Sequence, residues 1–113
     1  MTESDLRNAL RVCYDPELRI NIVDLGRIAS IRIEHDAEAP GLAQRDRVTV
    51  TLFPRNEEHD AILAAQIVNR LYGIREISRA EVRFDDAPAW SPDRMNAAAK
   101  HELGRQRGLI QIG

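Results

Sequence analysis

Cysteine is nearly absent from this chain of 113 residues, and aromatic side chains make up only 4% of it. The single cysteine, Cys13, can form no internal disulfide, which agrees with a reducing compartment. One chain therefore cannot supply the thiolates of a four-cysteine metal centre. With so few aromatic residues, the chain offers no series of stacking platforms for single-stranded nucleic acid.

The sequence also lacks an excess of basic charge and a long apolar run. Sixteen lysines and arginines stand against 18 acidic residues, for a net charge of −2. No global basic field holds a nucleic-acid backbone, so we expect no nucleic-acid partner. No segment is apolar for long enough to cross a bilayer, and the first residues lack the charged-then-apolar order of a secretion signal. We therefore expect a cytoplasmic protein with no membrane partner.

The familiar catalytic motifs do not occur. The sequence has no glycine-rich phosphate loop, no His-Glu-x-x-His, no Cys-x-x-Cys and no nucleophile elbow. Cys13 follows an amphipathic segment, and the carboxyl end of a helix does not favour a thiolate. At this position a buried structural cysteine is favoured over a cofactor ligand or a catalytic nucleophile. We expect that the chain is not an enzyme.

The segment 13–28 is the most informative part of the chain. Pro16 has no backbone N–H and disfavours a helical Asp15, so a helix from the N-terminus should end here. Beside this rigid turn, the carboxylates of Asp15 and Glu17 can accept hydrogen bonds from backbone amides. The later sequence Asp24-Leu25-Gly26 is turn-like and allows a positive φ before a strand.

These residues resemble the opening signature of the small metal–sulfur cluster biosynthesis family, which includes the SufT-like and PaaD-like iron–sulfur assembly proteins. The matching positions are Asp15-Pro16-Glu17, Asn21-Ile22-Val23-Asp24-Leu25-Gly26 and Ile28, then Phe53-Pro54, Pro88-Ala89-Trp90-Ser91-Pro92 and Leu103-Gly104. The resemblance covers the chain from Leu6 to Gly104 and is therefore more specific than a short motif. It implies an accessory protein of iron–sulfur cluster assembly or metalloenzyme maturation. Such a protein would act by binding assembly or client proteins, and it is compatible with a homo-oligomer.

In that family, the loop after the second strand typically carries a cysteine within Pro-Gly-Cys-Pro. Matching the strand VTVTLF and Pro54 places Asn56 at the cysteine position. An asparagine supplies no thiolate, so any iron–sulfur cluster would have to be shared with a partner or a second subunit. The alternative is a divergent interaction module of an oxygenase-type or other multisubunit system, with no cluster chemistry.

Hydrophobic periodicity predicts the first half of the fold. Thr2 or Ser4 caps a first helix, and two alternating strands at 29–34 and 47–53 form a hairpin with a long polar connection. A second helix then ends at Gly73. Its first turn carries Glu57, Glu58 and Asp60, which complement the helix dipole, and its apolar stripe is Ile62, Leu63, Ile67, Val68 and Leu71.

The second half completes an α+β pattern. A third strand spans 78–84, and Ser91 with Pro92 opens a last helix that ends at Gly104. The inner face of that helix is predicted as Met95, Ala98, Ala99 and Leu103. The tail 105–113 adds a short strand or docks on a neighbour. The order α-β-β-α-β-α indicates a two-layer sandwich in which helices cover one face of a small mixed or antiparallel sheet. We expect one domain over 1–113, with a family-like core of about 6–104.

Candidate site residues lie in the loops. Asp15, Glu17 and Asp24 could form an oxygen-ligand site or a docking patch, although local backbone hydrogen bonds are the favoured interpretation. His59 is the metal candidate, although a surface histidine is favoured there. The loop 56–60 is acidic and suits a hard cation or a basic partner surface. Trp90, framed by prolines, should pack over the core edge or contact a partner. The signature and partner-binding candidates are Asp15, Pro16, Glu17, Asp24, Gly26, Asn56 and Trp90.

Overall fold

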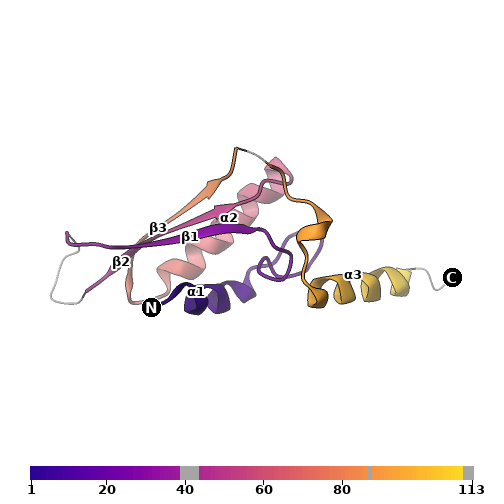
Figure 1. The fold of residues 1–113 in the computed structure, drawn as a ribbon, viewed down its shortest axis with the longest axis horizontal. Helices are drawn as coiled ribbons and strands as arrows, with labels where there is room; N and C mark the ends of the chain where they lie inside the picture. The colour runs from indigo at the N-terminus through magenta and orange to yellow at the C-terminus, as the bar shows by residue number, and fades with distance from the viewer. Residues whose placement is uncertain (39–43, 87, 111–113) are drawn as a thin grey trace.

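The computed structural model describes residues 1–38, 44–86 and 88–110. Its elements, in chain order, are helix α1 (Glu3–Ala9), 3₁₀ helix η1 (Leu10–Val12), strands β1 (Ile28–His35) and β2 (Asp46–Leu52), helix α2 (Glu57–Tyr72), strand β3 (Ile77–Phe84), 3₁₀ helix η2 (Pro92–Arg94) and helix α3 (Ala97–Ile110). The predicted α+β class and element order are confirmed (Figure 1).

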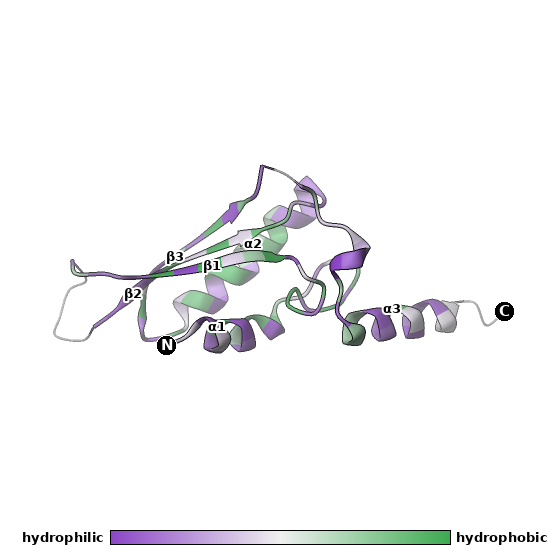
Figure 2. Cartoon of the chain, in the orientation of Figure 1, coloured by the Kyte–Doolittle hydropathy of each residue, from purple (hydrophilic) through white to green (hydrophobic). Residues whose placement is uncertain are grey.

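The three strands form one mixed sheet in the order β1-β2-β3. β1 runs antiparallel to β2, as the predicted hairpin requires, and β2 runs parallel to β3 through the α2 crossover. Hydrophobic and hydrophilic residues alternate along the strands (Figure 2). On β2, Val48, Val50 and Leu52 are buried. Helices α1 and α2 therefore cover one face of the sheet, and the other face is open (Figure 1).

Helix α1 starts and stops for local reasons. The Thr2 side chain accepts a hydrogen bond from the Asp5 amide, and Asp5 returns one to the Thr2 backbone, which completes a capping box. The helical path ends at Val12, and Cys13 is extended with φ −94°. The predicted end of the helix before Pro16 is confirmed.

The inner face of α2 differs from the prediction at its first turn. Its buried residues are Asp60, Leu63, Ile67 and Leu71, a stripe at spacings of three and four. Ile62 was wrongly predicted on this stripe, because the neighbouring position on a helix is rotated by about 100°. Its side chain is 52% exposed. Asp60, which was predicted only to complement the helix dipole in the first turn, is buried.

The predicted bounds of the last helix are wrong at both ends. Ser91 and Pro92 begin η2, and Met95 then adopts an extended conformation that separates this turn from α3. The Asn96 side chain caps α3 by accepting a hydrogen bond from the Ala99 amide at 2.9 Å. Gly104 does not end α3, because it keeps a helical conformation and the helix continues to Ile110. The strand predicted for the tail is therefore wrong over 105–110, and 111–113 lie outside the described residues.

Helix α3 does not cover the sheet but extends from one end of the molecule (Figure 1). It packs on a second hydrophobic cluster formed by Ile20, Leu25, Met95 and Ala99, with Leu18, Trp90 and Leu103 at its edge. Ala98, predicted on the inner face, is exposed. No helix among the described residues is long and apolar enough to cross a membrane.

Candidate functional site

A buried arginine joins the signature turn to the loop after β2. Arg27 donates from Nη1 to Asp15 Oδ2 at 3.0 Å and from Nη2 to Asp60 Oδ1 at 2.5 Å. Its Nε donates to the Phe53 carbonyl at 3.1 Å. All three charged side chains are buried, so each charge needs a partner and further hydrogen bonds.

Backbone amides satisfy the remaining carboxylate oxygens. Asp15 Oδ1 accepts hydrogen bonds from the amides of Glu17 and Leu18, both at 2.8 Å. Asp60 Oδ2 accepts one from the Arg55 amide at 2.9 Å. The ionic group therefore fixes the backbone on each side, and it holds the Asp15-Pro16-Glu17 turn against the start of α2.

A second, more exposed layer of charges lies outside this group. Glu17 Oε1 is 3.2 Å from Arg55 Nη2, and Glu17 Oε2 is 3.2 Å from His59 Nδ1. The Arg55 guanidinium also lies 5.8 Å from the centre of the Trp90 ring, in cation–π range. His59 is thus partly buried beside a carboxylate, whereas an exposed surface histidine was favoured from the sequence.

Asn56, which is predicted to occupy the position of the family cysteine, is the N-cap of α2. Its Oδ1 accepts a hydrogen bond from the His59 amide at 3.1 Å, and the residue is exposed. Beside it lies a groove of about 460 Å³, here called the Asn56 groove. The lining residues are Pro54, Arg55, Asn56, Glu57, Asp60, Ala61, Phe84 and Ala89. The groove lies at the carboxyl ends of the parallel strands β2 and β3, where open sheets commonly bind ligands.

The three acidic candidates of the signature do not converge. Asp24 accepts hydrogen bonds from Arg11 and Asn96 through Oδ1 and from Asn21 through Oδ2, each at 2.8 Å. Partial burial acts to raise the pKa of Asp24, but these hydrogen bonds outweigh it and lower the pKa. Asp24 therefore holds η1 and the start of α3 together, apart from Asp15 and Glu17. Within the described part of the chain, no group of three histidine, cysteine, aspartate or glutamate side chains could hold a metal ion.

Cys13 belongs to the main core. Its side chain is 2% exposed, and burial raises the pKa of its thiol, against the opposing charge of Arg70. A thiol in this place is a small apolar side chain and presents no thiolate at the surface.

Arg27 and Asp60 were missed from the sequence as site residues, and so was Arg55. Two signals were present. Asp60 has the spacing of the inner positions Leu63, Ile67 and Leu71, and Arg27 stands between the Gly26 turn and the buried strand residue Ile28. A charged residue at an inward position calls for an opposite charge at another inward position.

No protein-family profile matches the chain, but two curated proteins that resemble it carry the same description. The chain is 29% identical over 103 residues to an Fe-S protein maturation auxiliary factor of Porphyromonas gingivalis, and the match covers 91% of each protein. It is also 29% identical over 104 residues to the Bacillus subtilis factor of that description, covering 92% of this chain and 95% of the other. The chain is therefore similar, over nine tenths of its length, to two Fe-S protein maturation auxiliary factors. The predicted resemblance to iron–sulfur assembly proteins is confirmed.

A solved structure shares the fold of this chain. A Domain of Unknown Function DUF59 from Bacillus anthracis superposes with a TM-score of 0.69 at 26% identity. The match covers 90% of this chain and 91% of that one.

Proposed function

We propose that this chain, which is similar to Fe-S protein maturation auxiliary factors, acts by binding a protein of iron–sulfur assembly, or an apoprotein client, at the Asn56 groove. The observation that carries the proposal is the match over nine tenths of each auxiliary factor. The mode of action is inferred from the groove, whose mostly apolar walls and charged rim have the character of a protein-binding pocket.

Rigid backbone around the groove supports this choice. Arg27, Asp15 and Asp60 fix the loop before α2 from beneath, so a partner would meet a preorganised surface. Preorganisation lowers the entropy lost on binding. The charges of the partly buried Arg55, which lines the groove, and of the exposed Glu17 paired with it would contribute specificity and association rate more than affinity.

The burial of the only cysteine, Cys13, favours binding of a protein partner over ligation of an iron–sulfur cluster by this chain. Cys13 is buried in the main core, away from Asn56, which is predicted to occupy the position of the family cysteine. A cluster handled near this groove would take its thiolates from the bound protein or from a second subunit.

Two arginine substitutions on neighbouring turns of α2 test the groove. Ala61 lines it, whereas Ala65 is exposed on the same helix outside the lining. We expect Ala61→Arg to weaken binding to a scaffold or apo-client protein by about tenfold or more, because the long cation fills the groove. Ala65→Arg should bind as the wild type does. Binding is measured by anaerobic calorimetry, with activity of an Fe-S enzyme in cells lacking the gene as a second readout.

Two outcomes distinguish an error in the location of the binding surface from an error in the proposed function. Equal binding by both variants would place the partner surface elsewhere. Absence of binding to any scaffold or apo-client protein, together with full Fe-S enzyme activity in cells lacking the gene, would overturn the proposed function itself.

A further inference from the structure

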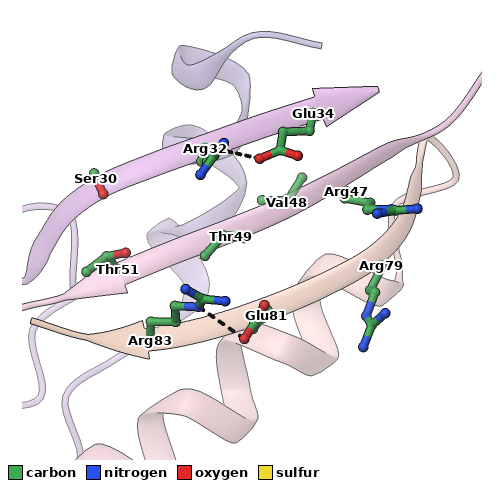
Figure 3. Close-up of a pocket in the computed structure, with 10 residues that line it drawn as sticks. All are labelled: Ser30, Arg32, Glu34, Arg47, Val48, Thr49, Thr51, Arg79, Glu81 and Arg83. Carbon is green, nitrogen blue, oxygen red and sulfur yellow. Dashed lines mark hydrogen bonds and ion pairs between the residues drawn. The ribbon is translucent and has the colours of Figure 1, made fainter. Parts of the chain in front are cut away.

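The open face of the sheet presents a regular grid of charged and hydroxyl side chains (Figure 3). The strand register places them in three rows across β1, β2 and β3. The rows are Glu34–Arg47–Arg79, Arg32–Thr49–Glu81 and Ser30–Thr51–Arg83. The hydroxyl residues along β2 form the base of a trough of about 570 Å³ between the longer side chains.

Four arginines and two glutamates line this face, and Asp36 and Glu38 at its end bring the number of acidic side chains to four. Arg32 pairs with Glu34 on β1, and Arg83 pairs with Glu81 on β3 at 3.1 Å. At the end of the face, Arg47 lies 3.0 Å from Asp36. A balanced face creates no strong field for an acidic polymer. Among the ion pairs of the described residues, Arg79 has no partner, although it is exposed on this face.

The pattern is complementary to itself under one rotation. If a second copy faces this sheet across a two-fold axis along β2, the rows stay in place and β1 lies opposite β3. Glu34 then faces the second copy's Arg79, and Arg32 faces the second copy's Glu81. Both contacts occur twice, because a two-fold interface is isologous. On the axis itself, Arg47 faces the second copy's Arg47. In each chain Asp36 and Glu38 lie 3.0 Å and 3.7 Å from this guanidinium and offset its charge.

The other face-to-face rotation brings like charges together. A two-fold axis across the strands reverses the rows and keeps each strand opposite itself. Arg32 would then face its own copy, Glu81 would do the same, and Arg79 would face Arg83. Like charges directly opposite one another are destabilising. The first arrangement therefore has four contacts of opposite charge and one of like charge, whereas the second has four of like charge, so the grid favours the first.

We propose that the open face of the sheet is a homodimer interface, in which a second copy packs face to face about a two-fold axis along β2. Facing sheets lie about 10 Å apart, a gap that opposed arginine and glutamate side chains span. Water fills the trough over Thr49 and Thr51. Because the face is small and polar, the dimer is transient and weakens with salt.

Charge reversal in two separate variants tests the arrangement. Arg79→Glu places a carboxylate opposite Glu34, and Glu34→Arg places a guanidinium opposite Arg79, so each variant alone should dimerise at least about tenfold more weakly. Mixed together, the two variants should associate again, because positions 34 and 79 then face each other with opposite charges. Arg75→Glu makes the same charge change in the exposed turn after α2, outside the face, and should dimerise as the wild type does.

Sedimentation velocity over a range of concentration and salt gives the readout, with far-UV circular dichroism to show that each variant is folded. A monomer at every concentration up to about 1 mM, where an interaction of about 4 kcal/mol is half saturated, would overturn the proposal. So would a wild-type dimer that both reversals leave intact, or reversed variants that stay monomeric when mixed.

Discussion

One buried side chain, Arg27, determines the shape of the candidate site. It contacts the signature turn through Asp15, the end of β2 through Phe53 and the start of α2 through Asp60. These three segments are distant in the sequence, and Arg27 contacts all of them. The planar guanidinium suits this task, because its donors point in fixed directions toward several acceptors.

Removal of Arg27 should therefore destabilise the whole protein. In Arg27→Met, two buried carboxylates lose their counter-charge, and we expect the free energy of unfolding to fall by about 3–5 kcal/mol. Arg11→Met is the matched control, since Arg11 pairs with Asp24 at 2.8 Å but is largely exposed. That change should cost about 1 kcal/mol or less. Urea unfolding followed by circular dichroism measures both values, and equal losses would contradict the assigned role of Arg27.

Sequence reasoning captured part of this residue-level chemistry. The turn at Pro16 and the positive φ at Gly26, which is 72°, follow from local backbone rules and are confirmed. The link from Arg27 to Asp60 could not be predicted in that way, because it spans 33 positions and depends on how α2 packs on the sheet. Local rules set the turns, and tertiary packing brought the charges together.

At the scale of elements, Asp36 joins the β1–β2 hairpin to β3. Its carboxylate accepts hydrogen bonds from the Ser78 hydroxyl at 2.7 Å and from Arg47 Nη2 at 3.0 Å. These hydrogen bonds lower the pKa of Asp36 from 3.8 to about 2. The one from Ser78 has the largest effect, and the one from Arg47 the next largest. Because the folded state favours the ionised form, Asp36 stabilises the fold above the pKa of the unfolded chain.

The contribution of Asp36 should disappear in acid. Asp36→Asn should lower the midpoint of thermal unfolding near pH 7, where the carboxylate is ionised in both states. As the pH falls from about 3.8 toward 2, the wild-type advantage is lost, and the two midpoints should converge. Asp86→Asn, a change at an exposed acidic residue after β3, is the control. A difference between Asp36→Asn and wild type that stays constant from pH 7 to acid would contradict this account.

The observed element boundaries agree with the predicted ones where side chains alternate, and they differ from the predicted ones near α3. The alternation of side chains with a period of two located strands β1, β2 and β3 correctly. The last helix was misplaced because Pro92 and Gly104 were interpreted as its two ends. Pro92 begins only a 3₁₀ turn, and Gly104 has open space around it, so no contact forces the helix to end there. Serine-proline and glycine signals mark possible boundaries, and packing decides which are used.

At the scale of the whole molecule, two hydrophobic clusters hold two parts together. The main core lies between the sheet and helices α1 and α2, and the second cluster lies beneath α3. Gly26 sits at the junction, where its backbone approaches the Arg94 carbonyl of η2. Nearby, Trp90 Nε1 donates to the Leu25 carbonyl at 2.6 Å, which closes the same junction. The orientation of α3 thus depends on close backbone contact, where a side chain at Gly26 has no room.

Gly26→Ala should loosen this junction. The new Cβ would collide with the Arg94 carbonyl oxygen, and an alanine is disfavoured at a φ of 72°. Together these costs predict a loss of about 2–5 kcal/mol in the free energy of unfolding, with faster amide hydrogen exchange in α3 than in α2. Gly104→Ala is the matched control, since nothing lies within 4 Å of the added Cβ. It should leave stability unchanged or raise it by up to about 1 kcal/mol, because alanine favours the helix. If the two variants were equally stable, η2 would be free to move away from Gly26, and α3 would not be fixed by this contact.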